Sequence, residues 1–220
     1  DGSAQLDTSA LHIWPRKEFM LMGLANTDNG FTGTIFGPWE GENSFESVKT
    51  EAEVEAYFQK FYPDAIPLIP NYKEQYLNNP TSALVIVRCE PWNHKSKVML
   101  VGDAAHAIVP FYGEGMNCGF EDIFVFDNLL DEMGDGDMGD LLNKYSEQRV
   151  PNGNAIADLS LRNFIEMRDL VSDPKFILRK KIEGKMYKNH PDKWMPLYSQ
   201  VKFTNIQYAD ALAAAKKQDQ

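Results

Sequence analysis

The sequence predicts a mixed α/β protein, with an antiparallel sheet in the first part and helices in most of the rest. Two observations predict this class. Short runs rich in β-branched and aromatic residues alternate with turn residues at the start of the chain, and longer segments with helical apolar spacing follow later. One strand–turn–helix unit joins the two parts. With 220 residues, the chain is long enough to bury a core in one or two domains.

Three predicted strands open the chain, at residues 10–14, 19–24 and 31–36. The turns between them contain proline, asparagine and glycine, which favours an antiparallel meander. Side chains alternate between the two faces of a strand. Alternation therefore places Met20, Met22 and Leu24 on one face of the second strand. Thr34 and Phe36 share a face of the third.

The next segment combines a helix with a second sheet region. A helix is expected to begin at Thr50, because Thr50 and Glu53 form a capping box ahead of an apolar-periodic run. Residues 71–80 are interpreted as a polar connection, because asparagines and a proline punctuate it. Residues 81–89 carry enough β-branched side chains to predict a return to strand.

The remaining elements are one short, fully buried strand and a series of helices. The strand is predicted at residues 97–101, and the first helix at residues 115–133 has Met116, Phe120 and Ile123 on one side. Two helices are expected around Pro151, over residues 141–170. Another helix covers residues 174–189, and the last begins near Asn205.

Composition and charge argue against several classes of function. The net charge of −10 disfavours nucleic acid or an anionic membrane surface as the main partner. No apolar run approaches the ~20 residues of a membrane-spanning helix, and no secretory signal pattern is found. Cys89 and Cys118 are expected to be reduced thiols in a cytoplasmic protein. The four histidines are scattered and predict no metal site.

The sequence GDGDMG at residues 134–139 matches the G-x-G-x-x-G dinucleotide pattern, but its context is wrong. That pattern needs a preceding strand, so that a diphosphate can reach a helix N-terminus. Here a helix is predicted before it, and the nearby carboxylates would repel a diphosphate. The spacing does not match an EF-hand loop either. We interpret this segment as a solvated acidic loop.

The stretch VMLVGDAAHAIVPFYGEGMNCGFED, residues 98–122, has the context that the acidic loop lacks. Gly102 ends a strand and lets a ligand approach the backbone, and the Asp103 carboxylate can accept hydrogen bonds from sugar-like hydroxyls. Residues 110–115 turn into a helix whose first N–H groups face the same crevice, where they stabilise negative charge by about 0.3–1 kcal/mol. An ordinary strand–turn–helix corner, with Asp103 at the surface, explains a lone Gly-Asp pair but not the whole stretch.

The segments GDAAH, GMN and GFED in this stretch resemble the second flavin-binding motif of the single-component FAD-dependent aromatic hydroxylases. Five further segments narrow the resemblance to the members that hydroxylate kynurenine: LHIWPR, FMLMGLANTD, FTGTIF, NFIEMRD and WMPLYSQVKF. The resemblance implies part of an FAD-binding, Rossmann-like hydroxylase fold. Residues 1–90 would form a substrate-binding sheet with helices, residues 91–150 the C-terminal part of the FAD-binding domain, and residues 151–220 a helical region that closes the substrate pocket.

The resemblance also implies roles for individual residues. Asp103 would bind the ribitol chain of FAD, and the backbone N–H groups of residues 115–117 would face the pyrimidine edge of the flavin ring. The implied FAD-binding residues are Gly102, Asp103, Pro110, Gly113, Gly115, Met116 and Asn117. No side chain is assigned as a catalytic acid or base. His106 is expected to have a structural role beside the flavin.

The implied substrate site involves three groups of side chains. Asn163 and Tyr198 would hydrogen-bond the amino-acid end of kynurenine, while Phe111 and Tyr112 with Pro110 would line the passage to the flavin. An apolar wall would consist of Met20, Met22, Leu24, Thr34 and Phe36. Without the resemblance, ordinary explanations come first: a helical asparagine is usually exposed, a tyrosine is often satisfied in the core, and a methionine-rich strand face usually packs.

The sequence departs from the family pattern at three positions. Tyr112 stands where phenylalanine or histidine is more common, Ala25 replaces a common proline, and Glu114 replaces the usual glutamine. Glu114 could place a charge near the flavin. We hypothesise that Glu114→Gln changes the pH profile of the enzyme, and an unchanged profile would count against this.

The implied reaction is the conversion of L-kynurenine to 3-hydroxykynurenine, with FAD as cofactor, NADPH as reductant and O₂ as co-substrate. The chain lacks a strand–GxGxxG–helix segment for the ADP part of FAD, so the N-terminal half of the same enzyme is an expected partner and the isolated chain is expected to be inactive. No membrane segment is predicted in it. Two alternatives stay open: a related flavin hydroxylase for another aromatic acid, and a non-catalytic fragment without flavin.

Overall fold

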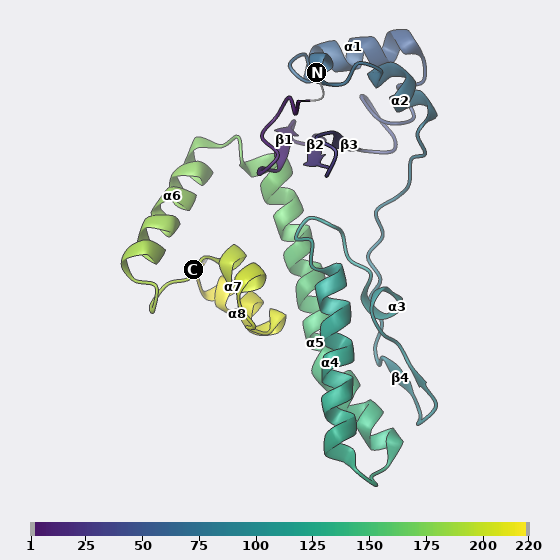
Figure 1. The fold of residues 1–220 in the computed structure, drawn as a ribbon, viewed down its shortest axis with the longest axis vertical. Helices are drawn as coiled ribbons and strands as arrows, with labels where there is room; N and C mark the ends of the chain where they lie inside the picture. The colour runs from purple at the N-terminus through teal and green to yellow at the C-terminus, as the bar shows by residue number, and fades with distance from the viewer. Residues whose placement is uncertain (1–2, 219–220) are drawn as a thin grey trace. The chain divides into compact units, whose positions relative to one another are not determined.

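A computed structural model describes residues 3–218 and divides the chain into two compact units (Figure 1). The first unit comprises the residues up to Ser82 together with Ile165–Ile177. The second comprises Ala83–Phe164 and the residues from Leu178 onward. The mixed α/β class is confirmed by helices and small antiparallel sheets. The assignment of residues 1–90, 91–150 and 151–220 to three functional regions stays a prediction.

The first unit contains the expected meander of strands β1 (His12–Pro15), β2 (Met20–Ala25) and β3 (Phe31–Phe36). Both strand pairs are antiparallel, and the register places Met20 opposite Phe36 and Met22 opposite Thr34. Directly opposite residues share a face of a sheet, so the expected common face is confirmed. Met20 and Met22 are buried, whereas Leu24 near the end of β2 is 46% exposed.

Helix α1 (Glu51–Phe61) packs on the opposite face of this sheet. The predicted capping box is confirmed, because the Thr50 hydroxyl accepts from the Glu53 N–H and the Glu53 carboxylate accepts from the Thr50 N–H. One apolar face of α1 then forms a single core with residues of β2 and its preceding turn. The buried members of that core are Phe19, Leu21, Val48, Val54, Tyr57, Phe58, Tyr62 and Ala65.

The polar connection predicted at residues 71–80 is wrong, because this segment forms helix α2 (Tyr72–Asn78) after the short 3₁₀ helix η1 (Ile66–Leu68). Tyr72 and Tyr76 are four residues apart and lie on one face of α2. The Tyr72 ring lies 4.6 Å from that of Phe58, and Tyr76 lies 6.2 Å from Tyr57. These aromatic contacts with α1 outweigh the local asparagine and proline signals.

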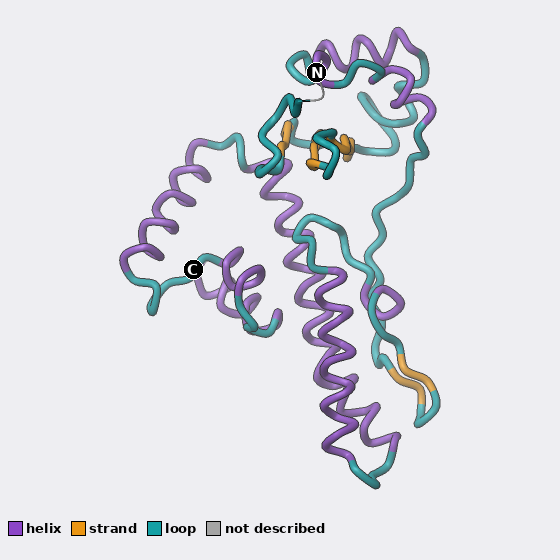
Figure 2. Tube along the Cα trace, viewed as in Figure 1, coloured by secondary structure: helices purple, strands orange, loops and turns teal. Residues whose placement is uncertain are grey.

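Both strands predicted between residues 81 and 101 are wrong. The first is absent, and the second is shorter than predicted. Residues 81–89 contain no strand (Figure 2), and their one backbone bond to a distant segment runs from the Val87 N–H to the Ala107 oxygen. The second strand shrinks to β5 (Val98–Met99), paired with β4 (Asn93–His94), and Val98 is 51% exposed. A buried strand needs neighbours on both sides, and within the described residues β5 has one.

The second unit is built on two long helices. The short helix α3 (Asp103–His106) precedes α4 (Gly115–Met133), whose bounds agree with the prediction. Helix α5 (Met138–Ile165) runs beside α4 (Figure 1) and continues through Pro151, so the prediction of two helices there is wrong. A proline inside a helix costs ~3 kcal/mol. Buried side chains on both sides of Pro151, such as Tyr145 and Ile156, hold α5 together, and Pro151 itself lies on its exposed side.

The C-terminal part of the chain is helical, as expected. A π-helical turn (Glu166–Leu170) follows α5, and α6 (Pro174–Asn189) has the predicted bounds. The helix expected near Asn205 is α8 (Tyr208–Gln218), while α7 (Leu197–Phe203) was not predicted as a helix. Among the described residues, no helix combines the length and the apolar character needed to cross a membrane.

Candidate functional site

A pocket of about 640 Å³ opens beside the N-terminal end of α4, within the second unit. All the predicted cofactor-binding residues except Asn117 line it. Sequence reasoning had not assigned four of its lining residues to a site: Ile108, Gly119, Phe120 and Ile123. The signal for three of these was the 3–4 spacing from Met116, which places Gly119, Phe120 and Ile123 on the same side of α4. The volume is typical of a small-molecule site.

The N-terminus of α4 presents backbone donors at this pocket. Its first intrahelical hydrogen bond runs from the Cys118 N–H to the Glu114 oxygen, at 2.8 Å. The N–H groups of residues 115–117 precede that bond and therefore have no acceptor inside the helix. Gly115 and Met116 line the pocket, whereas the Asn117 amide side chain binds Glu114. An electronegative edge of a ligand is favoured at such a helix end.

Glycine backbone lines part of the pocket together with Asp103. Gly102 has a φ of +61°, and a Cβ added there would meet no atom within 4 Å. A Cβ added at Gly119 would lie 3.6 Å from the Gly102 Cα, so the backbones of α4 and the turn approach closely. Asp103 is exposed, and its carboxylate has no hydrogen-bond partner among the described residues. The pocket thus offers a ligand the unobstructed backbone of Gly102 and the Asp103 carboxylate as a hydrogen-bond acceptor.

Behind the pocket, Asp122 anchors a buried polar network that sequence reasoning missed. Its Oδ2 accepts from the Gly102 N–H at 3.0 Å and from His106 Nε2 at 2.6 Å, and its Oδ1 accepts from Arg149 Nε at 2.8 Å. Asp122 and Arg149 are 0% and 1% exposed. The sequence signal for it was the position of Asp122 in the apolar stretch of α4, because a carboxylate buried in a helix needs a partner.

The contacts in this network favour the charged forms of His106 and Asp122. Burial works to lower the pKa of His106, but its hydrogen bonds with Asp122 and Cys118 raise it to about 10. Burial likewise works to raise the pKa of Asp122, and its bonds with His106, Arg149 and the Gly102 N–H hold that pKa below its usual value. At neutral pH this raised pKa favours a charged His106 that donates to Asp122. Its role beside a flavin stays a prediction.

Glu114 lies in a second buried network. Its carboxylate is bound by Lys202 Nζ at 2.6 Å and by the Tyr208 hydroxyl at 2.9 Å, and Lys202 also donates to the Tyr112 oxygen. Glu114 is 3% exposed and does not line the pocket. Its charge is thus balanced by Lys202 of α7, and the bond from Tyr208 connects the turn to α8 as well.

Glu114→Gln is expected to destabilise the protein by roughly 1–3 kcal/mol, because a charged hydrogen bond to Lys202 is lost. The measurement is the urea midpoint of unfolding. Glu147→Gln, at an exposed position of α5, is the matched control and should leave the midpoint unchanged. Equal midpoints for Glu114→Gln and wild type would contradict the structural role of this carboxylate.

The predicted substrate residues of the second unit meet at the same turn. Asn163 Nδ2 donates to the Phe111 oxygen at 2.8 Å, and the Phe111 ring stacks on that of Phe164. The Tyr112 ring stacks on Tyr198 with centroids 5.6 Å apart. Tyr198 is 49% exposed, while Phe111 and Tyr112 are buried. The five residues of the predicted apolar wall belong to the first unit.

Comparison with known proteins shows what this chain resembles. A family model described as an FAD binding domain matches residues 82–160, which contain the pocket, Asp122 and Arg149. A kynurenine 3-monooxygenase from Christiangramia forsetii is 53% identical over 96% of the chain and 47% of its own length. The chain is homologous to the kynurenine 3-monooxygenases. This confirms the resemblance found in the sequence.

Other kynurenine 3-monooxygenases match to a similar extent. The protein from Flavobacterium johnsoniae is 51% identical over 97% of the chain and 48% of its own length. The protein from Dictyostelium discoideum is 42% identical over 94% of the chain and 47% of its own length. The chain therefore spans about half the length of the curated relatives that it matches.

Proposed function

We propose that this chain is part of an enzyme that converts L-kynurenine to 3-hydroxykynurenine with NADPH and O₂. In this proposal the pocket beside Asp103 and the start of α4 binds the flavin, and the chain also forms part of the substrate pocket. One observation carries the proposal most directly. The pocket at the start of α4 lies inside the segment that matches an FAD binding domain, and Asp103 and the α4 N-terminus both line it. The homology to kynurenine 3-monooxygenases supports the choice of substrate.

The residues at the pocket fit the chemical groups of FAD. Asp103 is an exposed acceptor for the ribityl hydroxyls, and the N–H groups at Gly115 and Met116 match the electronegative pyrimidine edge. Gly102 and Gly113 have positive φ values and carry no side chain that would block a flat ring. Met116 and Phe120 are 72% and 67% exposed, which suits them to contact a ring that is part apolar.

The protein's part in the reaction is to bind, orient and exclude water. When bound, FAD supplies the hydride-accepting and oxygen-activating chemistry that amino-acid side chains lack. The N–H groups at the start of α4 stabilise negative charge at their end of the pocket. Ile108, Pro110 and Met116 line the pocket with apolar surface. Once the rest of the enzyme covers it, this surface helps to exclude water, and a dry site limits wasteful release of peroxide.

The rest of such an enzyme is the proposed partner of this chain. The exposed side of α4 carries Met116, Phe120, Ile123 and Phe124, each more than half exposed. Contiguous apolar surface of this kind marks an interaction site. We propose that FAD and the half of the enzyme outside this chain cover it, with the ADP part of FAD bound by that other half.

Asn163 and Tyr198 are proposed to bind the amino-acid group of kynurenine. Tyr198→Phe is the sharper variant, because it keeps the stacking on Tyr112 and removes one hydroxyl. A hydrogen bond to a charged group contributes ~1.5–3 kcal/mol, so Tyr198→Phe should weaken kynurenine binding about 10- to 100-fold. Asn163→Ala should have a similar effect, although it also removes the bond to Phe111.

Titration of the complete FAD-loaded protein with L-kynurenine measures this effect. Tyr187→Phe in α6 is the matched control, since it removes a tyrosine hydroxyl that is not part of the proposed site. Unchanged affinity in both Tyr198→Phe and Asn163→Ala would show that the substrate binds elsewhere.

The function itself is tested by NADPH oxidation in the complete enzyme, with and without L-kynurenine, and by the mass of the product. We expect kynurenine to stimulate oxidation and 3-hydroxykynurenine to form. Bound flavin without stimulation by kynurenine would instead support a hydroxylase for another aromatic acid. A stably folded complete protein that binds no flavin would contradict both.

A further inference from the structure

We infer that Asp122 is a positioning residue of the flavin site, which fixes the Gly102–Asp103 turn against α4 and is itself kept in place by His106 and Arg149. The inference rests on the proposed function, because it concerns the pocket assigned to FAD. Asp122 does not line that pocket, and its carboxylate is fully buried. It therefore acts on a ligand only through the residues that it holds.

Two contacts attach the Gly102–Asp103 turn to α4. The Gly102 N–H donates to Asp122 Oδ2 at 3.0 Å, and one helical turn earlier the Gly119 backbone approaches the Gly102 Cα. Asp103 follows Gly102 directly, and the same helix supplies the N–H groups of Gly115 and Met116. The two polar parts of the pocket are thus held at a fixed separation by a single helix, and Asp122 makes the polar contact that sets it.

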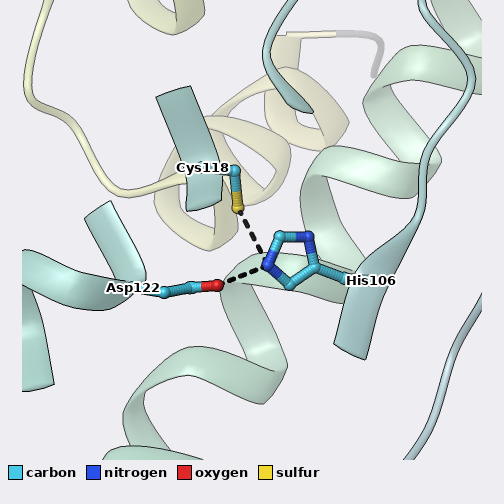
Figure 3. A group of neighbouring side chains, drawn as sticks. All are labelled: His106, Cys118 and Asp122. Carbon is cyan, nitrogen blue, oxygen red and sulfur yellow. Dashed lines mark hydrogen bonds and ion pairs between the residues drawn. The ribbon is translucent and has the colours of Figure 1, made fainter. Parts of the chain in front are cut away.

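Both oxygens of the Asp122 carboxylate accept hydrogen bonds. Figure 3 shows the His106 ring between Asp122 and Cys118, with Nε2 directed at the Asp122 oxygen. Arg149 binds the other oxygen and also pairs with Glu121 Oε2 at 2.9 Å. An ionised carboxylate only accepts hydrogen bonds, and the Gly102 N–H, His106 and Arg149 all donate to it. The geometry thus depends on an acceptor with two oxygens at this position.

A metal ion is a less suitable explanation for the same cluster. The ligand atoms of His106, Cys118 and Asp122 all lie within 4.8 Å of one another, and these residue types can bind zinc. The His106–Asp122 separation of 2.6 Å, however, is a hydrogen-bond distance. Nitrogen and oxygen ligands on a tetrahedral zinc ion lie about 3.3 Å apart, given their usual bond lengths. Arg149 also places a positive charge against the same carboxylate.

Asp122→Asn tests the inference, because the amide has nearly the same shape but only one acceptor oxygen. Its NH₂ group must face a donor, either Arg149 or the pair formed by Gly102 and His106. We expect the dissociation constant for FAD, measured by flavin fluorescence on the complete apoprotein, to rise at least tenfold. At saturating FAD, the KM for kynurenine should stay within twofold, since the substrate contacts are untouched.

Glu121→Gln is the matched control. It removes the other carboxylate partner of Arg149 and leaves the Asp122–Gly102 bond intact, so its FAD affinity should equal that of wild type. Equal FAD affinity in Asp122→Asn and wild type would overturn the inference. An equal loss in Asp122→Asn and Glu121→Gln would also overturn it, because the effect would then be general destabilisation.

If Asp122→Asn does not fold, His106→Gln decides instead. That variant removes the group that holds Asp122 Oδ2 and should weaken FAD binding severalfold, whereas unchanged binding would overturn the inference. Failure of the proposed function is distinguishable. A wild-type protein that binds FAD but does not hydroxylate kynurenine refutes the proposed reaction, while the comparison of FAD affinities still decides the role of Asp122. A wild-type protein that binds no FAD refutes both.

Discussion

Gly153→Ala is expected to lower the free energy of unfolding by about 2 kcal/mol or more, the cost of overpacking a filled core. A Cβ at this position of α5 would lie 2.6 and 2.7 Å from two ring atoms of Trp92 and 3.2 Å from the His106 Cβ. Trp92 is 2% exposed and cannot easily move, because its ring nitrogen donates to the Cys89 oxygen and its backbone N–H to the Ser146 hydroxyl. The clash outweighs the gain of about 1 kcal/mol that alanine normally brings to a helix interior.

Gly184→Ala in α6 provides the matched control. No atom lies within 4 Å of a Cβ added at Gly184, so this substitution should raise stability by roughly 0.5–1 kcal/mol. Urea unfolding followed by tryptophan fluorescence measures both variants. If Gly153→Ala were as stable as Gly184→Ala, the close packing of α5 on Trp92 would be wrong.

Stability is expected to fall as the pH rises from about 6.5 to 10, through loss of the His106 proton. Burial works to lower the pKa of His106, but Asp122 and Cys118 raise its folded-state value to about 10, whereas the unfolded value is near 6.5. A group with a raised pKa contributes its full stability below the unfolded pKa and loses it as the pH rises through the folded pKa. Within that window the slope approaches ~1.4 kcal/mol per pH unit. The charged groups facing His106 are Asp122 from α4 and, beyond it, Arg149 from α5, with the Cys118 thiol alongside.

His106→Gln isolates this contribution, because the other titrating groups are common to both proteins. The difference in unfolding free energy between wild type and His106→Gln should be largest near pH 6, and its pH-dependent part should be lost by about pH 10. Denaturation curves at pH 6, 8 and 10 measure it. A difference that stays constant with pH would contradict a charged His106 in the folded protein.

Local signals were enough to predict the elements that begin or end at a strong cap. The Thr50 capping box and the bounds of α4 agree with the structure, because side-chain caps and glycines act within a few residues. The meander was predictable for the same reason. Tyr72 and Tyr76 fold into α2 only because α1 offers aromatic partners, and this tertiary contact has no local signal. Pro151 likewise remains helical because of packing on both sides of it.

More of the pocket than of the Asp122 network could be predicted from the sequence. Small residues around Gly102 and a turn before α4 give a recognisable pattern, and the structure gathers them around one cavity. The pairing of Asp122 with Arg149 connects two helices across 27 positions, and no spacing rule predicts such a contact. The partners of Glu114 lie still further along the chain, at Lys202 and Tyr208. Roles in binding flavin and kynurenine stay predictions for all of these residues.

The most direct test of the account is the dissociation constant for FAD of the complete protein with Asp103→Ala. A hydrogen bond from a ribityl hydroxyl to a charged carboxylate contributes ~1.5–3 kcal/mol, so we expect the constant to rise about 10- to 100-fold. Asp127→Ala, an exposed position further along α4, is the matched control and should bind FAD as wild type does. If Asp103→Ala also bound FAD with wild-type affinity, the pocket beside Asp103 and the α4 N-terminus would not be the flavin site.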